Sequence, residues 1–390
     1  MIAERKQRRL VTPAFSTVVL STFAYFLAVG TVLPILPLYI EGPLAGDSAT
    51  VGLALGSSSL TALVLNIWAG RLGDRRGRRV LLVGGAVLVG VSILGLLIAR
   101  SVPVVILLRL IGGAGDAFFF VGGASAVSDL APEDRRGEAV SFYSLALHSG
   151  LAVGPVLGEV LFAGERYWAV WLAAAVLAAV AALVGTRLTD TRPVITPGAV
   201  ATRLIHPAAV MPGLVLIAGA VGASGFSAFV PLYAREIGLS GARFVFMTFS
   251  GILMMMRTLG ARLPDRLGST TAALAALAGT AVGLGIVGAW RDPVGLFAGT
   301  VIFALGHALL FPSLLMLSIS RATAHERAAV VGTLTSFLSL GFGGGPASLG
   351  IIARTAGYPG AFLVAAGIAA AGFVLFWRYS VGRAALVPAN

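Results

Sequence analysis

The sequence predicts an all-α membrane protein with twelve transmembrane helices arranged as two parallel six-helix repeats. The chain is 57% hydrophobic and only 11% charged, whereas ordinary soluble domains are about 25% charged. Its apolar runs reach the roughly 20 residues that a helix needs to span a bilayer. A charged island between two such runs, from Gly70 to Arg79, returns between Arg262 and Gly268, which indicates an internal duplication.

The apolar runs divide, with short polar breaks, into twelve predicted spans. The longest connection, around 188–207, is rich in proline, and we interpret residues 191–206 as a cytoplasmic linker between an N-terminal bundle (1–190) and a C-terminal bundle (207–390). The first run is longer than a signal-peptide core and lacks a clear cleavage site, so we expect it to be retained. The predicted spans are 13–40, 50–70, 80–99, 103–129, 138–162, 168–186, 208–235, 242–262, 270–289, 294–319, 328–353 and 360–378.

Basic residues predict the orientation of the chain. If the N-terminus is cytoplasmic, 20 of the 28 Lys and Arg residues fall in cytoplasmic segments, 6 fall on the opposite side, and Arg109 and Arg257 fall within spans. The positive-inside rule therefore predicts that both termini are cytoplasmic. The net charge of +12 is divided among loops, so we expect contact with a bacterial inner membrane and not with nucleic acid. The absence of cysteine excludes disulfides and thiolate metal sites, and we expect no metal or other cofactor.

Displacing the sequence by 191 positions brings several blocks of the two halves into register, with no gap needed between these blocks. Pro37-Leu38-Tyr39 also recurs, as Pro231-Leu232-Tyr233, at a slightly different offset. Aspartate, arginine and proline are scarce here, so their matches carry more weight than matches of alanine or leucine. Both copies have the same predicted orientation, a pattern typical of transporters that rock two halves around a central site. The matched pairs are Arg71/Arg262, Leu72/Leu263, Asp74/Asp265, Arg75/Arg266, Gly77/Gly268, Gly115/Gly306, Arg136/Arg327, Gly150/Gly341, Gly154/Gly345 and Pro155/Pro346.

Three motifs carry a family resemblance. The segment Gly70-x-Leu72-x-Asp74-Arg75-x-Gly77-Arg78-Arg79 resembles the first-loop motif of the major facilitator superfamily. The fifth-helix signature of the drug/proton antiporters in this superfamily resembles the segment Gly150-x-x-x-Gly154-Pro155-x-x-Gly158. The fourth-helix motif of the superfamily resembles Arg109-x-x-Gly112-Gly113-x-Gly115, with Gly112 where glutamine is usual. The resemblance covers essentially the whole chain and implies the major facilitator fold.

The same resemblance implies a gating cluster made of Gly70, Asp74, Arg75, Gly77, Arg78 and Asp129. Asp74 would face the N-terminal dipole of the helix that begins near Ala328, and Arg78 would pair with Asp129, so that the cluster locks the outward-facing state. The arginines can equally serve topology alone. We expect the glycines of 70–79 to let two helices reverse direction tightly.

Gly150, Gly154 and Gly158 form a stripe of small residues, which lets helices approach closely. Pro155 removes a backbone hydrogen bond and bends the helix. The stripe therefore suits a hinge or seal, or simple helix packing.

Ionisable residues inside the spans are the sharpest functional candidates, because a charge at the bilayer centre costs at least about 2.5–3.5 kcal/mol. Asp116 lies midway along its run and shares a helix face with Arg109. Desolvation favours the neutral form of a carboxyl group, so Asp116 could carry a proton while Arg109 tunes it. Glu159 and His148 are weaker candidates for proton coupling. The structural alternative for Asp116 is a hydrogen bond between helices.

The candidates for the substrate cavity are His307, Phe119, Phe226, Asn66 and Arg257. His307 falls on Asp116 in the repeat, and Arg257 falls on Asn66. The structural alternatives to a role in the cavity are a hydrogen bond from His307 to a backbone carbonyl and the packing of the aromatic rings against lipid. Drug/proton antiporters often carry an acidic residue in the first helix, and the run 13–40 contains none, which shifts the expected proton role to the fourth and fifth helices.

These observations predict a proton-coupled exporter of a small apolar or amphipathic molecule, of the drug-resistance type, that works by alternating access as a monomer. The alternative is a symporter or facilitator for a small polar metabolite such as a sugar. An enzyme or a sensor is disfavoured by the lack of a catalytic constellation or soluble domain. ATP-driven transport is disfavoured because the sequence contains no phosphate-binding loop.

Overall fold

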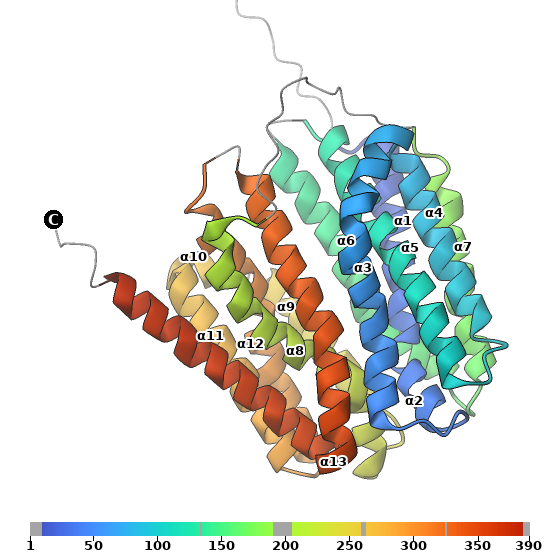
Figure 1. Ribbon diagram of the computed structural model, residues 1–390, viewed down its shortest axis with the longest axis vertical. Helices are drawn as coiled ribbons and strands as arrows, with labels where there is room; N and C mark the ends of the chain where they lie inside the picture. The colour runs from blue at the N-terminus through green and yellow to red at the C-terminus, as the bar shows by residue number, and fades with distance from the viewer. Residues whose placement is uncertain (1–9, 133–134, 190–204, 259–262, 324–325, 385–390) are drawn as a thin grey trace, which may run out of the picture.

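The computed structural model describes residues 10–132, 135–189, 205–258, 263–323 and 326–384, and every regular element in these ranges is a helix (Figure 1). The predicted fold class is therefore confirmed. The N-terminal bundle contains α1 (Pro13–Val32), α2 (Ile35–Glu41), α3 (Ser48–Arg76), α4 (Arg78–Gly95), α5 (Val102–Leu130), α6 (Arg136–Leu161) and α7 (Tyr167–Gly185). The C-terminal bundle contains α8 (Pro207–Glu236), α9 (Arg243–Thr258), α10 (Leu263–Leu267), α11 (Ser269–Ala289), α12 (Pro293–Ile319) and α13 (Arg327–Ala384).

Among the described residues, ten segments are long and apolar enough to cross a membrane. One of them, Ala329–Gly382, contains both arms of α13, which meet at Gly357 with φ at +71°. The sixteen residues of α9 lie beside residues outside the described ranges. α1 and α2 together form one span, the two arms of α13 form two, and the five-residue α10 lies between spans. The other helices, α9 included, form one span each, so the helices correspond to the twelve predicted spans. Many large apolar side chains are exposed, as a lipid-facing surface requires.

Local sequence explains where the long helices begin and break. The Asp47 carboxylate accepts a hydrogen bond from the Thr50 N–H and caps α3, and Asp292 caps α12 in the same way. Such side chains satisfy backbone donors that the first turn of a helix leaves free. Pro34 lies between α1 and α2, where its missing N–H interrupts the hydrogen-bond ladder.

The turn between α3 and α4 is shorter than the sequence predicts. α3 continues through Gly70 and Asp74 to Arg76, and only Gly77, with φ at +96°, reverses the chain. The expectation that Gly70 forms part of the turn is therefore wrong. The helix can extend this far because arginines in its last turn interact favourably with the negative end of its dipole.

The duplication is visible in how the helices pack. A Cβ atom on Gly115 would lie 2.7 Å from the carbonyl oxygen of Gly85, and one on Gly306 would lie 2.7 Å from that of Ala276. These four positions differ by the same displacement that superimposes the two halves of the sequence. α4 therefore meets α5 as α11 meets α12, with glycine allowing backbone contact.

The small-residue stripe of α6 packs against α1 of the same bundle. A Cβ on Gly154 would lie 2.6 Å from the Cα of Gly30, and one on Gly150 would lie 2.7 Å from the backbone nitrogen of Leu27. A Cβ on Gly158 would collide with the carbonyl oxygen of Thr31. Close packing of α1 on α6 accounts for the stripe directly.

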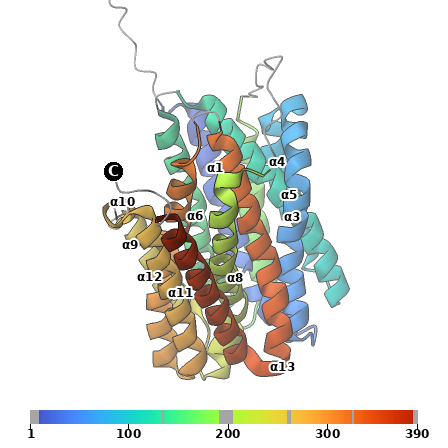
Figure 2. The ribbon, with the colours of Figure 1, turned by 60° about the vertical axis from the view of Figure 1, so that its left-hand side comes forward.

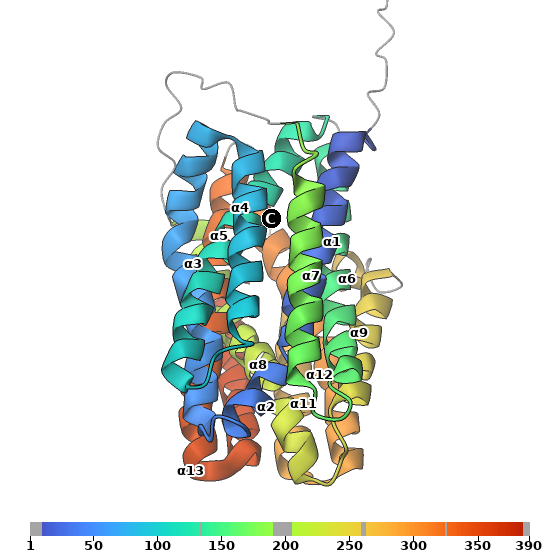
Figure 3. The same cartoon turned by 90° about the vertical axis from the view of Figure 1, so that its right-hand side faces the viewer.

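The two bundles meet closely at the end of the molecule that carries α2 and the Gly357 corner of α13, called the α2 end below (Figures 1 and 3). There α3 contacts the first arm of α13 so tightly that a Cβ on Gly52 would collide with the carbonyl oxygen of Pro346. The ribbons of α3 and α13 diverge toward the opposite end, called the Gly77 end (Figure 1). Figure 2 shows α8, α9, α11, α12 and α13 gathered in the second bundle.

Candidate functional site

Asp116 lies at the centre of a polar cluster in the N-terminal bundle. The Tyr25 hydroxyl of α1 donates a hydrogen bond of 2.5 Å to its Oδ1 atom. The Tyr25 ring stacks on Phe119 with ring centroids 3.7 Å apart and planes 5° apart. Phe119 has no exposed surface, so it supports Tyr25 and is not itself accessible from a cavity.

Arg109 completes this cluster, which we call the Asp116 cluster. Its Nη2 atom donates a hydrogen bond of 2.7 Å to the Ser58 hydroxyl of α3, while its buried Nε atom has no partner. Arg109 interacts electrostatically with both Asp116 and Tyr25, although it is not within ion-pair distance of the carboxylate. The charges of Arg109 and Asp116 therefore partly compensate each other, although neither oxygen of Asp116 forms a direct ion pair.

A second cluster joins the two bundles. It contains His148 on α6, Arg257 on α9 and His307 on α12, and we call it the Arg257 cluster. Arg257 interacts electrostatically with both imidazoles, and the two imidazoles interact with each other. α6 packs against α9 across the bundle boundary, which brings His148 to residues far away in the sequence.

Both clusters lie at the same depth. Asp116 on α5, Arg257 on α9 and His307 on α12 each lie about 20 Å along their helices from the α2 end, at ~1.5 Å per residue. His148 lies at a similar distance from the end of α6 at Leu161. This depth is near the middle of a bilayer, where an ionisable residue indicates function by default.

The hydrogen bonds of the second cluster are incomplete. The Nδ1 atom of His148 lies 2.6 Å from the Ser144 carbonyl, to which a protonated Nδ1 donates. The buried Nδ1 of His307 and Nε of Arg257 have no hydrogen-bond partner. The His307 ring lies 5.6 Å from that of Phe303 and 6.0 Å from that of Phe249.

Two further cavity candidates have different environments. Asn66 on α3 has a buried Oδ1 atom without a partner. Phe226 on α8 has no exposed surface and packs against Phe249 and Phe303. Phe226 therefore lies behind the rings that adjoin His307.

The charged residues at the Gly77 end form a compact group within the N-terminal bundle. The Arg78 Nε atom lies 3.1 Å from Asp129 Oδ2, and its Nη1 atom lies 2.8 Å from Asp74 Oδ1. The pairing expected between Arg78 and Asp129 is present. Asp74 binds Arg78 of its own bundle and is half exposed, and the side chains of Arg327 and Ala328 at the start of α13 lie outside the described residues.

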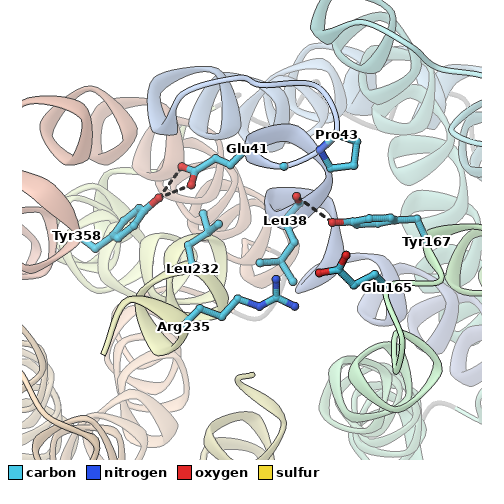
Figure 4. A pocket seen from close by; sticks show the side chains of 9 residues that line it. Leu38, Glu41, Pro43, Glu165, Tyr167, Leu232, Arg235 and Tyr358 are labelled. Carbon is cyan, nitrogen blue, oxygen red and sulfur yellow. Dashed lines mark hydrogen bonds between the residues drawn. The ribbon is translucent and has the colours of Figure 1, made fainter. Parts of the chain in front are cut away.

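Hydrogen bonds join the bundles at the α2 end. The Tyr358 hydroxyl of α13 lies 2.5 and 2.6 Å from the two carboxylate oxygens of Glu41 (Figure 4). The Glu159 Oε1 atom of α6 accepts a hydrogen bond of 3.2 Å from the backbone N–H of Ala242, just before α9. Glu159 therefore contacts the opposite bundle at this end and lies far from the mid-depth clusters.

A cavity of about 520 Å³ opens beside this contact. Figure 4 shows Glu41, Glu165, Arg235 and Tyr358 around it, and none of the residues that the sequence singles out lines it. Its lining residues are Leu38, Glu41, Gly42, Pro43, Glu165, Tyr167, Leu232, Arg235 and Tyr358.

Sequence reasoning missed Tyr25, Ser58 and the pair formed by Glu41 and Tyr358. Tyr25 could have been noticed, because it places a hydroxyl in the middle of a run without acidic residues. The other contacts depend on helix pairing that a single sequence does not reveal. Within the described ranges, no group of three His, Cys, Asp or Glu side chains could hold a metal ion.

Comparison with known proteins agrees with this architecture. Residues 18–321 and 214–388 match the family model described as Major Facilitator Superfamily. The uncharacterized MFS-type transporter STM4428 of Salmonella typhimurium is 28% identical over 358 residues, covering 90% of this chain and 92% of the relative. The uncharacterized MFS-type transporter YhhS of Escherichia coli is 26% identical over 377 residues, covering 93% and 91%.

Two solved structures share the fold. A bacterial homologue of the human lysosomal transporter Spinster, in an inward-facing and occupied conformation, has a TM-score of 0.80 at 14% identity, covering 94% of this chain and 96% of the other. The human organic anion transporter MFSD10 has a TM-score of 0.70 at 20% identity, covering 93% and 99%. At these identities the likeness concerns the fold alone.

Proposed function

Because this chain belongs to the Major Facilitator Superfamily, it is a multi-pass membrane transporter, and we propose that it exports a small amphipathic molecule in exchange for protons. Transporters built from parallel repeats alternate access by rocking their halves around a mid-membrane site. The rocking units in this proposal are residues 1–190 and 207–390. We further propose a bacterial inner-membrane location, with both termini and the Gly77 end in the cytoplasm.

The observation that carries the proton coupling is the environment of Asp116. Its carboxyl group lies at mid-depth, accepts a hydrogen bond from Tyr25, and interacts with Arg109 without a direct ion pair. A carboxyl group held in this way can exist in both protonation states, because Tyr25 and Arg109 stabilise the anion while burial favours the neutral acid. Protonation of Asp116 would neutralise its carboxylate, so the charge of the mid-depth site would differ between the two states of the cycle.

The contacts at the α2 end and at the Gly77 end suit the two gates of such a cycle. We propose that Glu41, Tyr358 and Glu159 hold the outer gate closed in the conformation described here. Asp74, Arg75, Arg78 and Asp129, with Gly70 and Gly77, would form the inner gate, at the end where the ribbons of α3 and α13 diverge (Figure 1). Gly150, Gly154, Pro155 and Gly158 would preserve the packing of α6 during rocking.

Flux in reconstituted vesicles tests the coupling. The probes are naphthalene-2-sulfonate, naphthalene-2-sulfonamide and (2-naphthylmethyl)trimethylammonium, which share one apolar ring system and differ in charge. We expect an imposed pH gradient to drive accumulation of a probe against the proton flow, and Asp116→Asn to reduce this accumulation to the level of empty vesicles. Tyr25→Phe should lower it about tenfold, since a hydrogen bond to a charged group contributes roughly 1.5–3 kcal/mol.

The control is Glu138→Gln, which neutralises an exposed carboxylate at the start of α6 and should leave the accumulation unchanged. Flux through the wild-type protein that ignores the gradient would instead indicate a facilitator. Accumulation in the direction of the proton flow would indicate a symporter. An Asp116→Asn protein with unaltered gradient dependence would exclude Asp116 as the proton carrier.

A further inference from the structure

We propose that the transported molecule is an amphipathic anion, and that its negative group binds between the bundles at Arg257, His307 and His148. This inference deepens the proposed function, on which it rests, by naming the substrate class of the mid-depth site. The binding group can be a carboxylate, sulfonate or phosphate, since all three offer oxygen atoms in the geometry that a guanidinium recognises.

The first argument is the charge of the cluster. Arg257 carries a permanent positive charge, because a guanidinium keeps its proton in proteins. It interacts electrostatically with both imidazoles. No carboxylate of the described residues forms an ion pair with any member of the cluster. Asp116 interacts with Arg109 and Tyr25 instead.

The second argument is the cost of this arrangement. Charged groups inside a membrane protein pair with one another or mark the path of a substrate or ion. A cation at the bilayer centre is costly even on the mildest insertion scales. Within the described part of the chain, no side chain offsets this cost at Arg257, and an anionic ligand would.

The third argument is the set of open hydrogen-bond positions. The buried Nε of Arg257 and Nδ1 of His307 have no partners, although buried polar atoms are nearly always paired. All three residues keep part of their surface accessible, so a ligand could reach the cluster. Because α6 belongs to one bundle and α9 and α12 belong to the other, an anion held here would contact both halves.

The fourth argument identifies the amphipathic character. The His307 ring adjoins Phe249 and Phe303, whose centroids lie 5.4 Å apart. Phe303 is fully buried, whereas Phe249 keeps accessible surface. An apolar body attached to the negative group can therefore pack on Phe249. A sugar would leave Arg257 uncompensated, and an organic cation would be repelled by it.

Equilibrium binding to the full-length protein in phosphatidylcholine nanodiscs tests the inference without any pH gradient. The probe is radiolabelled naphthalene-2-sulfonate, competed by the unlabelled sulfonate, by naphthalene-2-sulfonamide or by (2-naphthylmethyl)trimethylammonium. We expect the sulfonate to compete at least about tenfold better than its neutral amide, which corresponds to ~1.4 kcal/mol. Arg257→Gln should weaken sulfonate binding by a similar factor, and Arg257→Lys should weaken it less because the charge remains.

The matched control is Arg291→Gln, which removes an exposed arginine outside the cluster and should leave binding unchanged. His148→Gln provides a second variant from the opposite bundle, should Arg257→Gln fail to fold. Absence of sulfonate binding to the wild-type protein, equal affinity for sulfonate and sulfonamide, or unchanged binding in folded Arg257→Gln protein would overturn the proposal. Binding measured at equilibrium can succeed even if proton coupling through Asp116 fails, so the two failures are distinguishable.

Discussion

The two bundles share one arrangement of helices, but the partners of a buried arginine differ between them. In the N-terminal bundle, Arg109 has a hydroxyl partner in Ser58 and an acid, Asp116, in its electrostatic field. In the C-terminal bundle, His307 occupies the position that matches Asp116, and no acid of the described residues compensates Arg257. Of these groups only Asp116 and His307 occupy matched positions, since Arg257 matches Asn66 and Arg109 matches Thr300. The two bundles therefore place their buried arginines at different positions of the repeat.

This difference suggests a division of labour between the halves. In the proposed function, the Asp116 cluster, whose acid and cation partly compensate each other, would exchange the proton. In the same proposal, the Arg257 cluster, which no acid of the described residues compensates, would be stabilised by the anion that binds there. In a rocking transporter, both clusters can act at the same depth while serving different ions.

Making the second bundle resemble the first should have the largest effect on binding. In His307→Asp, the new carboxylate would lie in the field of Arg257 and replace the missing anion. We expect naphthalene-2-sulfonate to bind at least about tenfold more weakly, because ligand and carboxylate would compete for one guanidinium (~1.4 kcal/mol for each factor of ten). Equilibrium competition in nanodiscs measures the change.

The control for this substitution is His307→Asn, which removes the imidazole without adding charge. It should bind the sulfonate better than His307→Asp does. If the two variants bind equally, the imidazole itself recognises the ligand and compensation of Arg257 is not the deciding property. Either variant should leave the packing at Gly306 intact, since Gly115 accommodates an aspartate at the matched position.

The shared backbone plan predicts an equal response of the two bundles to a packing defect. Gly115→Val and Gly306→Val each place a side chain where the Cβ atom alone would lie 2.7 Å from a carbonyl oxygen. Overpacking of this kind typically costs about 1–3 kcal/mol. We expect both variants to lower the thermal unfolding temperature in detergent by similar amounts, and a loss confined to one bundle would show that their packing has diverged.

Gly84→Val is the matched control for that pair. No heavy atom lies within 4 Å of a Cβ at Gly84, so the substitution changes the same residue type on a neighbouring helix without a collision. Its unfolding temperature should stay near that of the wild type.

Much of the fold is predictable from the sequence, because span length and arginine-rich ends are local properties. The twelve predicted runs correspond to helices, and the motif arginine Arg78 pairs with Asp129. The end of α3 was not predictable, since Gly70 is an ordinary helical residue here and only Gly77 turns. A pattern of glycines does not show which of them adopts a positive φ.

The site was predictable in part. The cost of buried charge singled out Asp116, Arg109, Arg257 and both histidines, but not their grouping. His148 lies in the electrostatic field of Arg257 because α6 packs on α9, and Tyr25 binds Asp116 because α1 approaches α5. Such neighbours follow from the packing of distant segments, which repeat spacing and hydropathy do not encode.

The smallest predicted effect concerns the segments that precede α6 and α13 at the Gly77 end, where matched positions carry residues of opposite charge. In the first, Arg135 binds Glu138 at 2.7 Å. In the second, Glu326 occupies the position that matches Arg135. Hydrogen bonds from the Thr323 hydroxyl and backbone N–H, with a smaller contribution from His206, lower the pKa of Glu326 to about 2.

Because the pKa of Glu326 in the folded protein lies below its ordinary value of 4.5, its stabilising contribution is complete at neutral pH. The contribution falls as the pH drops from about 4.5 toward 2, where the folded carboxylate also takes up a proton. We therefore expect Glu326→Gln to lower the unfolding temperature slightly at pH 7, and the difference from the wild type to shrink below pH 4.5. Since Glu326 is exposed to solvent, which screens its interactions, the shift should be much smaller than that of Gly306→Val. A constant difference across this pH range would mean that the glutamine disturbs the turn by its shape, and not by the loss of a charge.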